Sequence, residues 1–388
     1  MNSIYFTEEH EYFRATFKEF LQKEVVPHIE KWEKDGAVER FIWRKFGEMG
    51  YFGLRTPEAY GGMELDLFYT LIFLEELQKI KSGGFAAAMW AHEYLAMTHL
   101  IEEGSEFIKQ KYLVPSVSGE KIGCLCITEP FGGSDVAGIR STAIKSEEKY
   151  ILNGSKTFIT NGVYSDYLIV AAKTNPDQKY KGISIFVVDR DAKGVSASKL
   201  EKLGWHASDT GEIAFDNVEI PKENLLGEEG KGFAYIMQHF ALERLLMGVN
   251  AHARAEYAVD YAIQYMSERT AFGKTIDKFQ ALRHKIAEMA SKVDMCKEYN
   301  YSIAKRLDDG NYVVKEASMS KMLSTKIADE VIYDALQLLG GYGYMEEYPL
   351  ARLLRDSRLG PIGGGTSEIL KEIIAKMVID KKAYKPAT

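Results

Sequence analysis

The chain has 388 residues, of which 46% are hydrophobic and 27% charged, and it carries a formal net charge of −7 with three cysteines. This length allows two or three domains with a substantial core, and the composition is typical of a globular protein. An acidic chain argues against a nucleic-acid or anionic-membrane partner, and three cysteines form no disulfide framework.

The first ten residues show neither a secretory nor a transit-peptide pattern, and no apolar run approaches the roughly 20 residues that span a bilayer. We therefore expect a cytoplasmic protein without a membrane span. Cys124 and Cys126 alternate with Leu125 and Ile127 as in a strand, and further ligands at zinc spacing are missing. Buried packing is the expected role of both thiols, and we predict no metal site.

Apolar residues recur at helical spacing in much of the first 120 residues. A first helix is predicted over 12–25, after a start signal at Thr7. A second run over 71–80 should end at Gly83-Gly84, and a third helix should occupy 85–100. These patterns predict an N-terminal helical domain.

The period changes to two between about 121 and 235. Asn153-Gly154 and Asn161-Gly162 are flanked by apolar or β-branched residues, a pattern that predicts hairpins. The runs 167–172 and 183–188 indicate buried strands. We expect a compact antiparallel β domain here.

Helical spacing then returns and lasts almost to the end of the chain. Long helices are predicted over 233–266, 279–307 and 311–338, with a last helix over 366–380. The predicted fold is therefore α+β and multidomain. Its domains are an N-terminal helical domain (1–121), a middle antiparallel β domain (122–234) and a C-terminal four-helix bundle (235–388).

The loop 126–138 joins the helical part to the β part, and its sequence is Cys-Ile-Thr-Glu-Pro-Phe-Gly-Gly-Ser-Asp-Val-Ala-Gly. Its glycines expose backbone N–H groups, and Thr128, Ser134 and Asp135 add short polar side chains. A flat or anionic ligand could therefore approach closely. The alternative is an ordinary turn between domains.

Glu243 lies in the middle of a predicted helix whose neighbouring positions include Phe240, Leu246 and Met247. A carboxylate on such an apolar face is costly unless it has a partner or a chemical task. Arg244 points about 100° away around the helix and could hold a nearby anion or carbonyl. The alternative is an ordinary glutamate at a helix surface.

Two glycine runs occur in the tail, at 340–343 and 363–365. They would let a flat or phosphorylated ligand rest on the backbone, and Thr366 could cap a helix whose dipole favours negative charge. Neither run follows a strand, so neither is a dinucleotide-binding fingerprint. Turns between helices are the alternative.

These motifs together resemble the acyl-CoA dehydrogenase family from end to end. Residues 126–138 fit the first signature of the family, and residues 337–356, from Gln-Leu-Leu-Gly-Gly to Arg-Asp, fit the second. The resemblance implies the fold of that family, FAD as cofactor, a coenzyme A thioester substrate and a role in lipid metabolism such as fatty-acid β-oxidation. It also implies a homotetramer built as a dimer of dimers, with electron-transfer flavoprotein as the electron acceptor.

The resemblance also assigns residues to the cofactor and the substrate. Those implied to meet FAD in the same subunit are Cys126, Ile127, Thr128, Gly133, Ser134, Phe158, Ile159 and Thr160. Those implied to meet FAD elsewhere, mainly in a neighbouring subunit, are Arg269, Phe272, Gln280, Gln337, Leu338, Gly340, Gly341, Thr366 and Glu368. Those implied to meet the substrate are Leu125, Ser134, Phe240, Arg244, Gly364 and Gly365.

The catalytic base is where the chain departs from many members. They carry a glutamate directly before the Gly-Thr pair that is Gly365-Thr366 here, but this chain has Gly364, which cannot accept a proton. In the long-chain and isovaleryl types the base lies in a Glu-Arg-Leu context on a C-terminal helix, and Glu243-Arg244-Leu245 matches it. The resemblance therefore makes Glu243 the base.

The implied reaction is α,β-dehydrogenation of a saturated acyl-CoA to trans-2-enoyl-CoA, in which Glu243 takes the α-proton and flavin N5 the β-hydride. The backbone N–H of Gly364 is implied to hold the thioester oxygen. Space at 363–365 favours a long or branched chain, whereas Trp90, Met89 and Phe85 could shorten the cavity. The alternatives are an acyl-CoA oxidase, whose chains are usually longer, and a non-catalytic flavin-bearing relative that binds nucleic acid.

Overall fold

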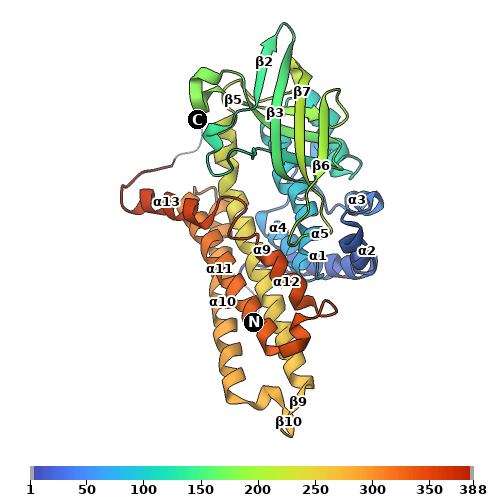
Figure 1. Ribbon diagram of the computed structural model, residues 1–388, viewed down its shortest axis with the longest axis vertical. Coiled ribbons are helices and arrows are strands. Elements are labelled where there is room, and N and C mark those ends of the chain that lie inside the picture. The colour runs from blue at the N-terminus through green and yellow to red at the C-terminus, as the bar shows by residue number, and fades with distance from the viewer. Residues whose placement is uncertain (1–3, 385–388) are drawn as a thin grey trace.

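The computed structural model describes residues 4–384 and shows helices, then a sheet, then long helices in chain order (Figure 1). This confirms the predicted α+β organisation. Among the described residues, no helix combines the length and apolar character needed to cross a membrane.

The N-terminal helices begin with α1 (Glu8–Phe20), where the Thr7 hydroxyl accepts a hydrogen bond from the His10 N–H and the His10 ring accepts one from the Thr7 N–H. This reciprocal cap confirms the predicted start. The other helices of this part are α2 (Ile29–Asp35), α3 (Arg40–Glu48), α4 (Leu67–Gln78), α5 (Gly83–Trp90), α6 (Met97–Glu103), α7 (Glu106–Ile108) and α8 (Val114–Val117).

The expectation that Gly83-Gly84 would end the second helix is wrong. That helix already ends at Gln78, and both glycines open α5 behind an N-cap at Ser82, which accepts from the Phe85 N–H. A Cβ on Gly84 would lie 2.8–2.9 Å from backbone atoms of Trp205 and Ala207. The glycines therefore permit close packing of α5 against a loop of the middle domain.

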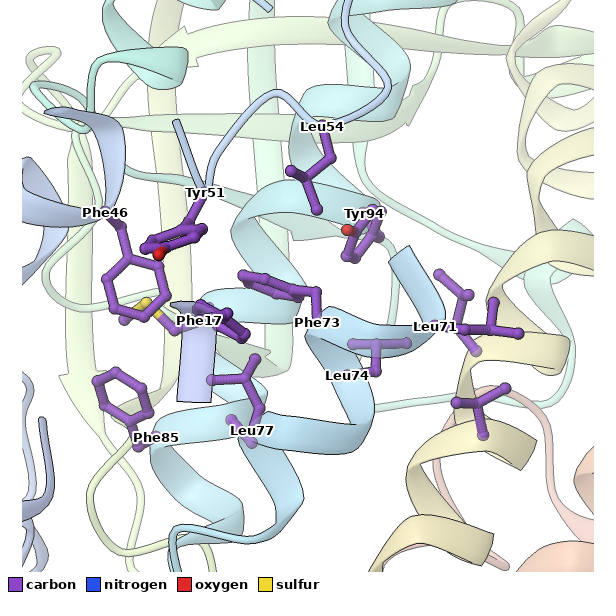
Figure 2. Close-up of a cluster of buried hydrophobic side chains, with 14 of the residues drawn as sticks. Phe17, Phe46, Tyr51, Leu54, Leu71, Phe73, Leu74, Leu77, Phe85 and Tyr94 are labelled. Atoms are coloured by element: carbon purple, nitrogen blue, oxygen red, sulfur yellow. The ribbon is translucent and has the colours of Figure 1, made fainter. Parts of the chain in front are cut away.

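Aromatic side chains fill the core of the N-terminal part (Figure 2). Phe17 and Phe73 stack with ring centroids 5.1 Å apart, and Phe46 packs edge-on against both. Leu245 and Leu246, from the long C-terminal helix that contains Glu243, belong to the same buried cluster. This shared core fixes the middle of that helix against the N-terminal helices.

The middle of the chain forms a mainly antiparallel sheet in the order β6-β7-β3-β2-β4-β5-β8, and β1 pairs with β4 in parallel. The strands are β1 (Gly123–Cys126), β2 (Thr142–Ser146), β3 (Lys149–Thr160), β4 (Tyr167–Lys173), β5 (Ile183–Asp189), β6 (Val195–Lys199), β7 (Thr210–Pro221) and β8 (Leu225–Leu226). The buried strands expected at 167–172 and 183–188 are β4 and β5.

The hairpin predicted at Asn153-Gly154 is wrong, because both residues lie inside β3. The register between β3 and β7 shifts at this point, and the Asn153 amide oxygen accepts a hydrogen bond from the Asn217 N–H. A Cβ on Gly154 would overlap the Ser141 side chain. The Asn-Gly pair therefore forms a bulge, and the glycine admits a neighbouring side chain. Asn161-Gly162 likewise makes no hairpin between paired strands, since β3 and β4 are separated by β2.

The C-terminal part is a bundle of long helices that runs away from the sheet (Figure 1). Its elements are α9 (Gly232–Glu268), β9 (Thr270–Ala271), β10 (Lys274–Thr275), α10 (Gln280–Asp308), α11 (Val314–Leu338), α12 (Pro349–Ser357) and α13 (Ser367–Val378). The spans of α9, α10, α11 and α13 agree with the predicted helices, whereas α12 was not predicted. The β9–β10 hairpin lies at the end of the bundle far from the sheet.

Candidate active site

A buried ion pair fastens the loop after β1 to strand β3. Lys156 on β3 donates to the Glu129 carboxylate at 2.8 Å and to the Ile127 carbonyl at 3.0 Å. Glu129 also accepts from the backbone N–H groups of Arg140 and Ser141, at 2.5 and 3.0 Å. Burial alone would raise the pKa of Glu129, but the Lys156 ammonium and these hydrogen bonds hold that pKa below its usual value. These contacts give Glu129 a structural role in fastening the loop.

The tip of this loop is open to solvent. Gly133 and Ser134 are exposed, and Thr128 is partly buried, with its carbonyl accepting from the Thr157 N–H at 2.9 Å. Asp135 accepts a hydrogen bond from the Gly138 N–H and so shapes the loop. Backbone and hydroxyl groups at the tip remain available to a ligand.

Two of the residues assigned to FAD have buried side chains, so only their backbone atoms could contact a ligand. Cys126 and Ile159 are buried in the core of the sheet, and the Cys126 sulfur lies 3.7 Å from that of Cys124. Phe158, by contrast, is 70% exposed and holds a positive φ of 60°. A bulky residue in this conformation is strained, and an exposed aromatic ring there could pack against a flat ligand.

Glu243 and the glycine turn before α13 meet on one face of α9. A Cβ on Gly364 would lie 3.2 Å from a Glu243 carboxylate oxygen and would overlap the Met247 sulfur. Gly364 also has a positive φ of 60°. Only glycine fits this position. The space expected at 363–365 is therefore partly filled by Met247.

The turn itself is held in place by Lys321, a fully buried lysine of α11. Its ammonium donates to the Gly365 carbonyl at 2.6 Å. The Gly363 N–H bonds to the Leu359 carbonyl, whereas the structure shows no partner for the Gly364 N–H among residues 4–384. Within the described chain, Gly364 therefore combines an unpaired N–H with a position beside the Glu243 carboxylate.

Burial and nearby basic side chains have opposite effects on the pKa of Glu243. Burial raises the pKa of its carboxyl, and Arg244, Lys321 and His239 act in the other direction without cancelling the rise. Burial also lowers the pKa of Lys321 to about 8. A buried carboxylate with a raised pKa is a candidate general base.

His239 is oriented by two residues of α6. Its Nε2 lies 2.8 Å from one oxygen of Glu103, and His99 Nδ1 lies 3.1 Å from the other. The two imidazole rings meet edge-on at 4.7 Å. His239 lies one turn before Glu243 on α9, and its contacts with Glu103 and His99 connect the site to the N-terminal helices.

Arg244 is a buried cation with few partners. It donates to the Ser318 hydroxyl at 3.4 Å and lies over the Phe240 ring at 5.4 Å, and in the described part of the chain its Nε has no acceptor. Phe240 packs against the same cluster as Leu125 and Ile127 at the end of β1. The β1 loop and the first third of α9 are therefore neighbours, as the assignment of these residues to one site requires.

The remaining assigned residues lie elsewhere in the chain. A pocket at the far end of the bundle is lined by Arg269, Gln337, Leu338, Gly340 and Gly341. Phe272 at the tip of the β9–β10 hairpin is 95% exposed with a φ of 52°, and Gln280 begins α10 nearby. Thr366 caps α13 by accepting from the Ile369 N–H, with Glu368 in its exposed first turn.

These two sets cannot surround one ligand within a single chain. Glu243 and Arg269 are 26 residues apart on the same helical path, which corresponds to about 39 Å. The structure thus brings Glu243, Gly364, Gly365, Arg244 and Phe240 together, and separates them from the Arg269 pocket. Sequence reasoning missed Lys321 and the Glu103 triad, because an isolated lysine or glutamate in a helical pattern carries no signal of burial.

Comparison with known proteins gives this site its context. Profiles of the N-terminal, middle and C-terminal domains of acyl-CoA dehydrogenase match residues 7–120, 124–218 and 230–379. The mitochondrial long-chain specific acyl-CoA dehydrogenase of Mus musculus is 39% identical over 384 residues, covering 96% of this chain and 87% of that protein. An acyl-CoA dehydrogenase structure from Geobacillus kaustophilus is 42% identical with a TM-score of 0.94, covering 97% of this chain and 100% of that one. An acyl-CoA dehydrogenase structure complexed with FAD from Bacillus anthracis is 31% identical with a TM-score of 0.91, covering 97% and 68%.

A flavin-dependent oxidoreductase is the class that this fold and these likenesses define. The chain belongs to the acyl-CoA dehydrogenase family, which confirms the predicted family, enzyme class and cofactor FAD. The residues present fit this cofactor, because Gly340 and Gly341 border open space and two strained, exposed aromatic rings, Phe158 and Phe272, lie uncovered.

Proposed function

We propose that the protein catalyses α,β-dehydrogenation of a saturated acyl-CoA to trans-2-enoyl-CoA, with Glu243 as the base. One observation carries this proposal: the Glu243 carboxylate lies beside Gly364, whose N–H has no partner among residues 4–384. An acid with a raised pKa and an oxyanion donor are the two groups that removal of a proton next to a thioester carbonyl requires.

The protein groups act as follows. The Gly364 N–H donates to the thioester oxygen, so negative charge that develops there on loss of the α-proton is stabilised. Glu243 removes that proton, and substrate that displaces water from the apolar face of α9 raises its pKa further and makes it a stronger base. Bound FAD supplies the acceptor for the hydride from the β-carbon. Lys321 keeps the Gly364 donor in position through the Gly365 carbonyl.

FAD binding across subunits follows from the separation of the two residue sets. The β1 loop and Phe158 would hold the flavin of one subunit, while Arg269, Phe272 and the Gln337 pocket of another subunit would reach its far end. The strained and 95% exposed Phe272 ring supports this arrangement, since it contacts little within its own chain. A homotetramer built as a dimer of dimers is the corresponding assembly.

The finer aspects of function rest on relatives. The name of the mouse relative specifies long-chain substrates, and we propose long or branched acyl chains here. Trp90 does border the cavity beyond Met247, whereas Phe85 and Met89 are buried in the N-terminal core. Two proposals rest on the sequence instead: electron-transfer flavoprotein as the electron acceptor, which the family resemblance implies, and the cytoplasm as the location.

A substrate panel tests the proposal. Anaerobic mixing of the FAD-loaded enzyme with straight and branched acyl-CoAs should bleach the flavin absorbance for at least one chain class. Reoxidation should then be fast with electron-transfer flavoprotein and slow in air, because rapid peroxide formation would indicate an oxidase instead. An enzyme that retains FAD but is bleached by none of the acyl-CoAs would refute the proposed function.

A further inference from the structure

A small cavity lies beyond the candidate active site along α9. It has a volume of about 30 Å³, and its lining includes Met247, Asn250 and Arg254 from α9, Gln78 from α4 and Trp90 from α5. The Met247 sulfur would also meet a Cβ on Gly364, so this side chain borders both the cavity and the turn beside Glu243.

The cavity continues the active-site face of the helix. Glu243, Met247, Asn250 and Arg254 follow one another at intervals of four, three and four residues, which places all four on one stripe. Glu243 and Arg254 are 11 residues apart, about 16 Å along the axis and nearly in line. An acyl chain that starts beside Glu243 and follows this stripe would reach the cavity with its far end.

The polar groups in the lining are joined by a directed chain of hydrogen bonds. Arg254 donates from Nε and Nη2 to the Gln78 amide oxygen, at 3.0 and 2.9 Å. Because arginine is only a donor, this bond fixes the orientation of Gln78, whose Nε2 then donates to Asn250 Oδ1 at 2.6 Å. The Asn250 amide is fixed in turn, and its Nδ2 remains a donor.

The cavity wall therefore holds donors that lack acceptors. Neither Asn250 Nδ2 nor Arg254 Nη1 has a hydrogen-bond partner among residues 4–384, although both side chains are more than nine-tenths buried. Trp205 also lines the cavity, and among the described residues its enclosed indole N–H has no partner. An enclosed donor left unpaired is costly, so an acceptor in the cavity would be favourable.

Nearby carboxylates do not satisfy Arg254. Asp356 accepts from the Gly83 and Trp205 N–H groups, and Asp329 accepts from Ser357 and Arg358. No ion pair joins either of them to Arg254 in the described part of the chain. A cavity of this size has room for about two water molecules or for one polar group of a ligand.

We propose that this cavity binds an oxygen function at the far end of the acyl chain, a terminal carboxylate or a hydroxyl, and that such chains are preferred over plain chains of equal length. This inference rests on the proposed function, since it concerns the chain of the same acyl-CoA. The hydroxyls of Thr325 and Ser357, which also line the cavity, already donate to the carbonyls of Lys321 and Leu354. The nitrogen donors of Asn250, Arg254 and Trp205 lack an acceptor among residues 4–384, and both oxygen functions can accept from them.

The first experiment compares chains of equal length on the FAD-loaded enzyme. Octanoyl-, decanoyl-, dodecanoyl- and tetradecanoyl-CoA are each measured beside their ω-carboxy and ω-hydroxy counterparts, and kcat/KM is determined. We expect a preference of roughly tenfold or more for an ω-oxygenated chain at one length or more. A preference for the carboxylate or for the hydroxyl shows which of the two terminal groups the cavity binds. Equal or lower values for every oxygenated chain would overturn the inference but not the proposed function, whereas failure of all chains to bleach the flavin would overturn both.

Variants then test the residues. Arg254→Met keeps an apolar stem but removes the donors, so kcat/KM for the preferred oxygenated chain should fall about tenfold while the plain chain stays within about twofold. Trp205→Phe, which removes the indole N–H but keeps an aromatic ring, should shift the ratio in the same direction if Arg254→Met does not fold. Arg306→Met is the matched control, because Arg306 pairs with Glu316 at the exposed end of α10. An equal fall for plain and oxygenated chains would overturn the inference.

Discussion

Replacement of Lys156 by methionine should release the loop 126–138 from the sheet. The lysine ammonium is fully buried and is the only cation bonded to Glu129 in the described structure, and it also binds the Ile127 carbonyl. Lys156→Met leaves a buried carboxylate without its counter-charge. Loss of one partner of a buried ion pair typically costs about 3–5 kcal/mol. This is a large part of the roughly 5–15 kcal/mol by which a domain is stable.

The loss of stability in Lys156→Met should depend on pH. The pKa of Glu129 is lowered in the folded protein, so its stabilising contribution is present above the unfolded pKa and disappears as the pH falls through the folded pKa. The difference between Lys156→Met and the native protein should therefore be largest at neutral pH and shrink in acid.

Urea unfolding at fixed protein and FAD concentrations, with flavin retention after gel filtration, measures this effect. Lys149→Met is the matched control, because Lys149 lies on the same strand and forms an exposed pair with Glu219; it should cost less than about 1 kcal/mol. The double variant Glu129→Gln/Lys156→Met should lose less than the sum of the single changes. Native-like stability and full flavin retention in Lys156→Met would show that the pair does not hold the loop.

Two further changes probe the turn beside Glu243. Gly364→Ala places a Cβ against Met247 at a positive φ, so it should destabilise the protein by about 1–3 kcal/mol and lower kcat, as thermal unfolding and steady-state assays would show; unchanged values would contradict the close packing. Lys321→Met removes the donor to the Gly365 carbonyl and should cost about 1.5–3 kcal/mol. It also removes a cation that lowers the pKa of Glu243, so the acidic limb of the pH–kcat/KM profile should move to higher pH, and a profile that stays in place or moves to lower pH would contradict the proposed electrostatics.

Much of the secondary structure could be predicted from local chemistry and from the spacing of apolar residues. The Thr7 cap and the strong spacing of 233–266 and 311–338 predicted real helices, and alternating strands predicted β4 and β5. The predictions based on Gly83 and Gly154 were wrong. These glycines allow close packing between segments that are separate in the sequence, which a local pattern cannot show.

The site was predictable to the extent that it depends on family motifs. Glu243 and Gly364 could be selected from their sequence context, but their proximity through Met247 depends on how α9 packs against the turn. Lys321 and Arg254 were not predicted, because their burial is set by the packing of three or more elements, and a charged residue in a helical pattern is usually assigned to the surface.

Single-turnover bleaching of the flavin in Glu243→Gln tests the central claim most directly. Under anaerobic conditions with a good acyl-CoA substrate, this variant should retain FAD and bind substrate but bleach about 10²–10⁴-fold more slowly than the native enzyme. Glu256→Gln, a change on the same helix at a residue paired with Lys297, should bleach at the native rate. Bleaching of Glu243→Gln at a rate close to native would contradict the assignment of Glu243 as the base.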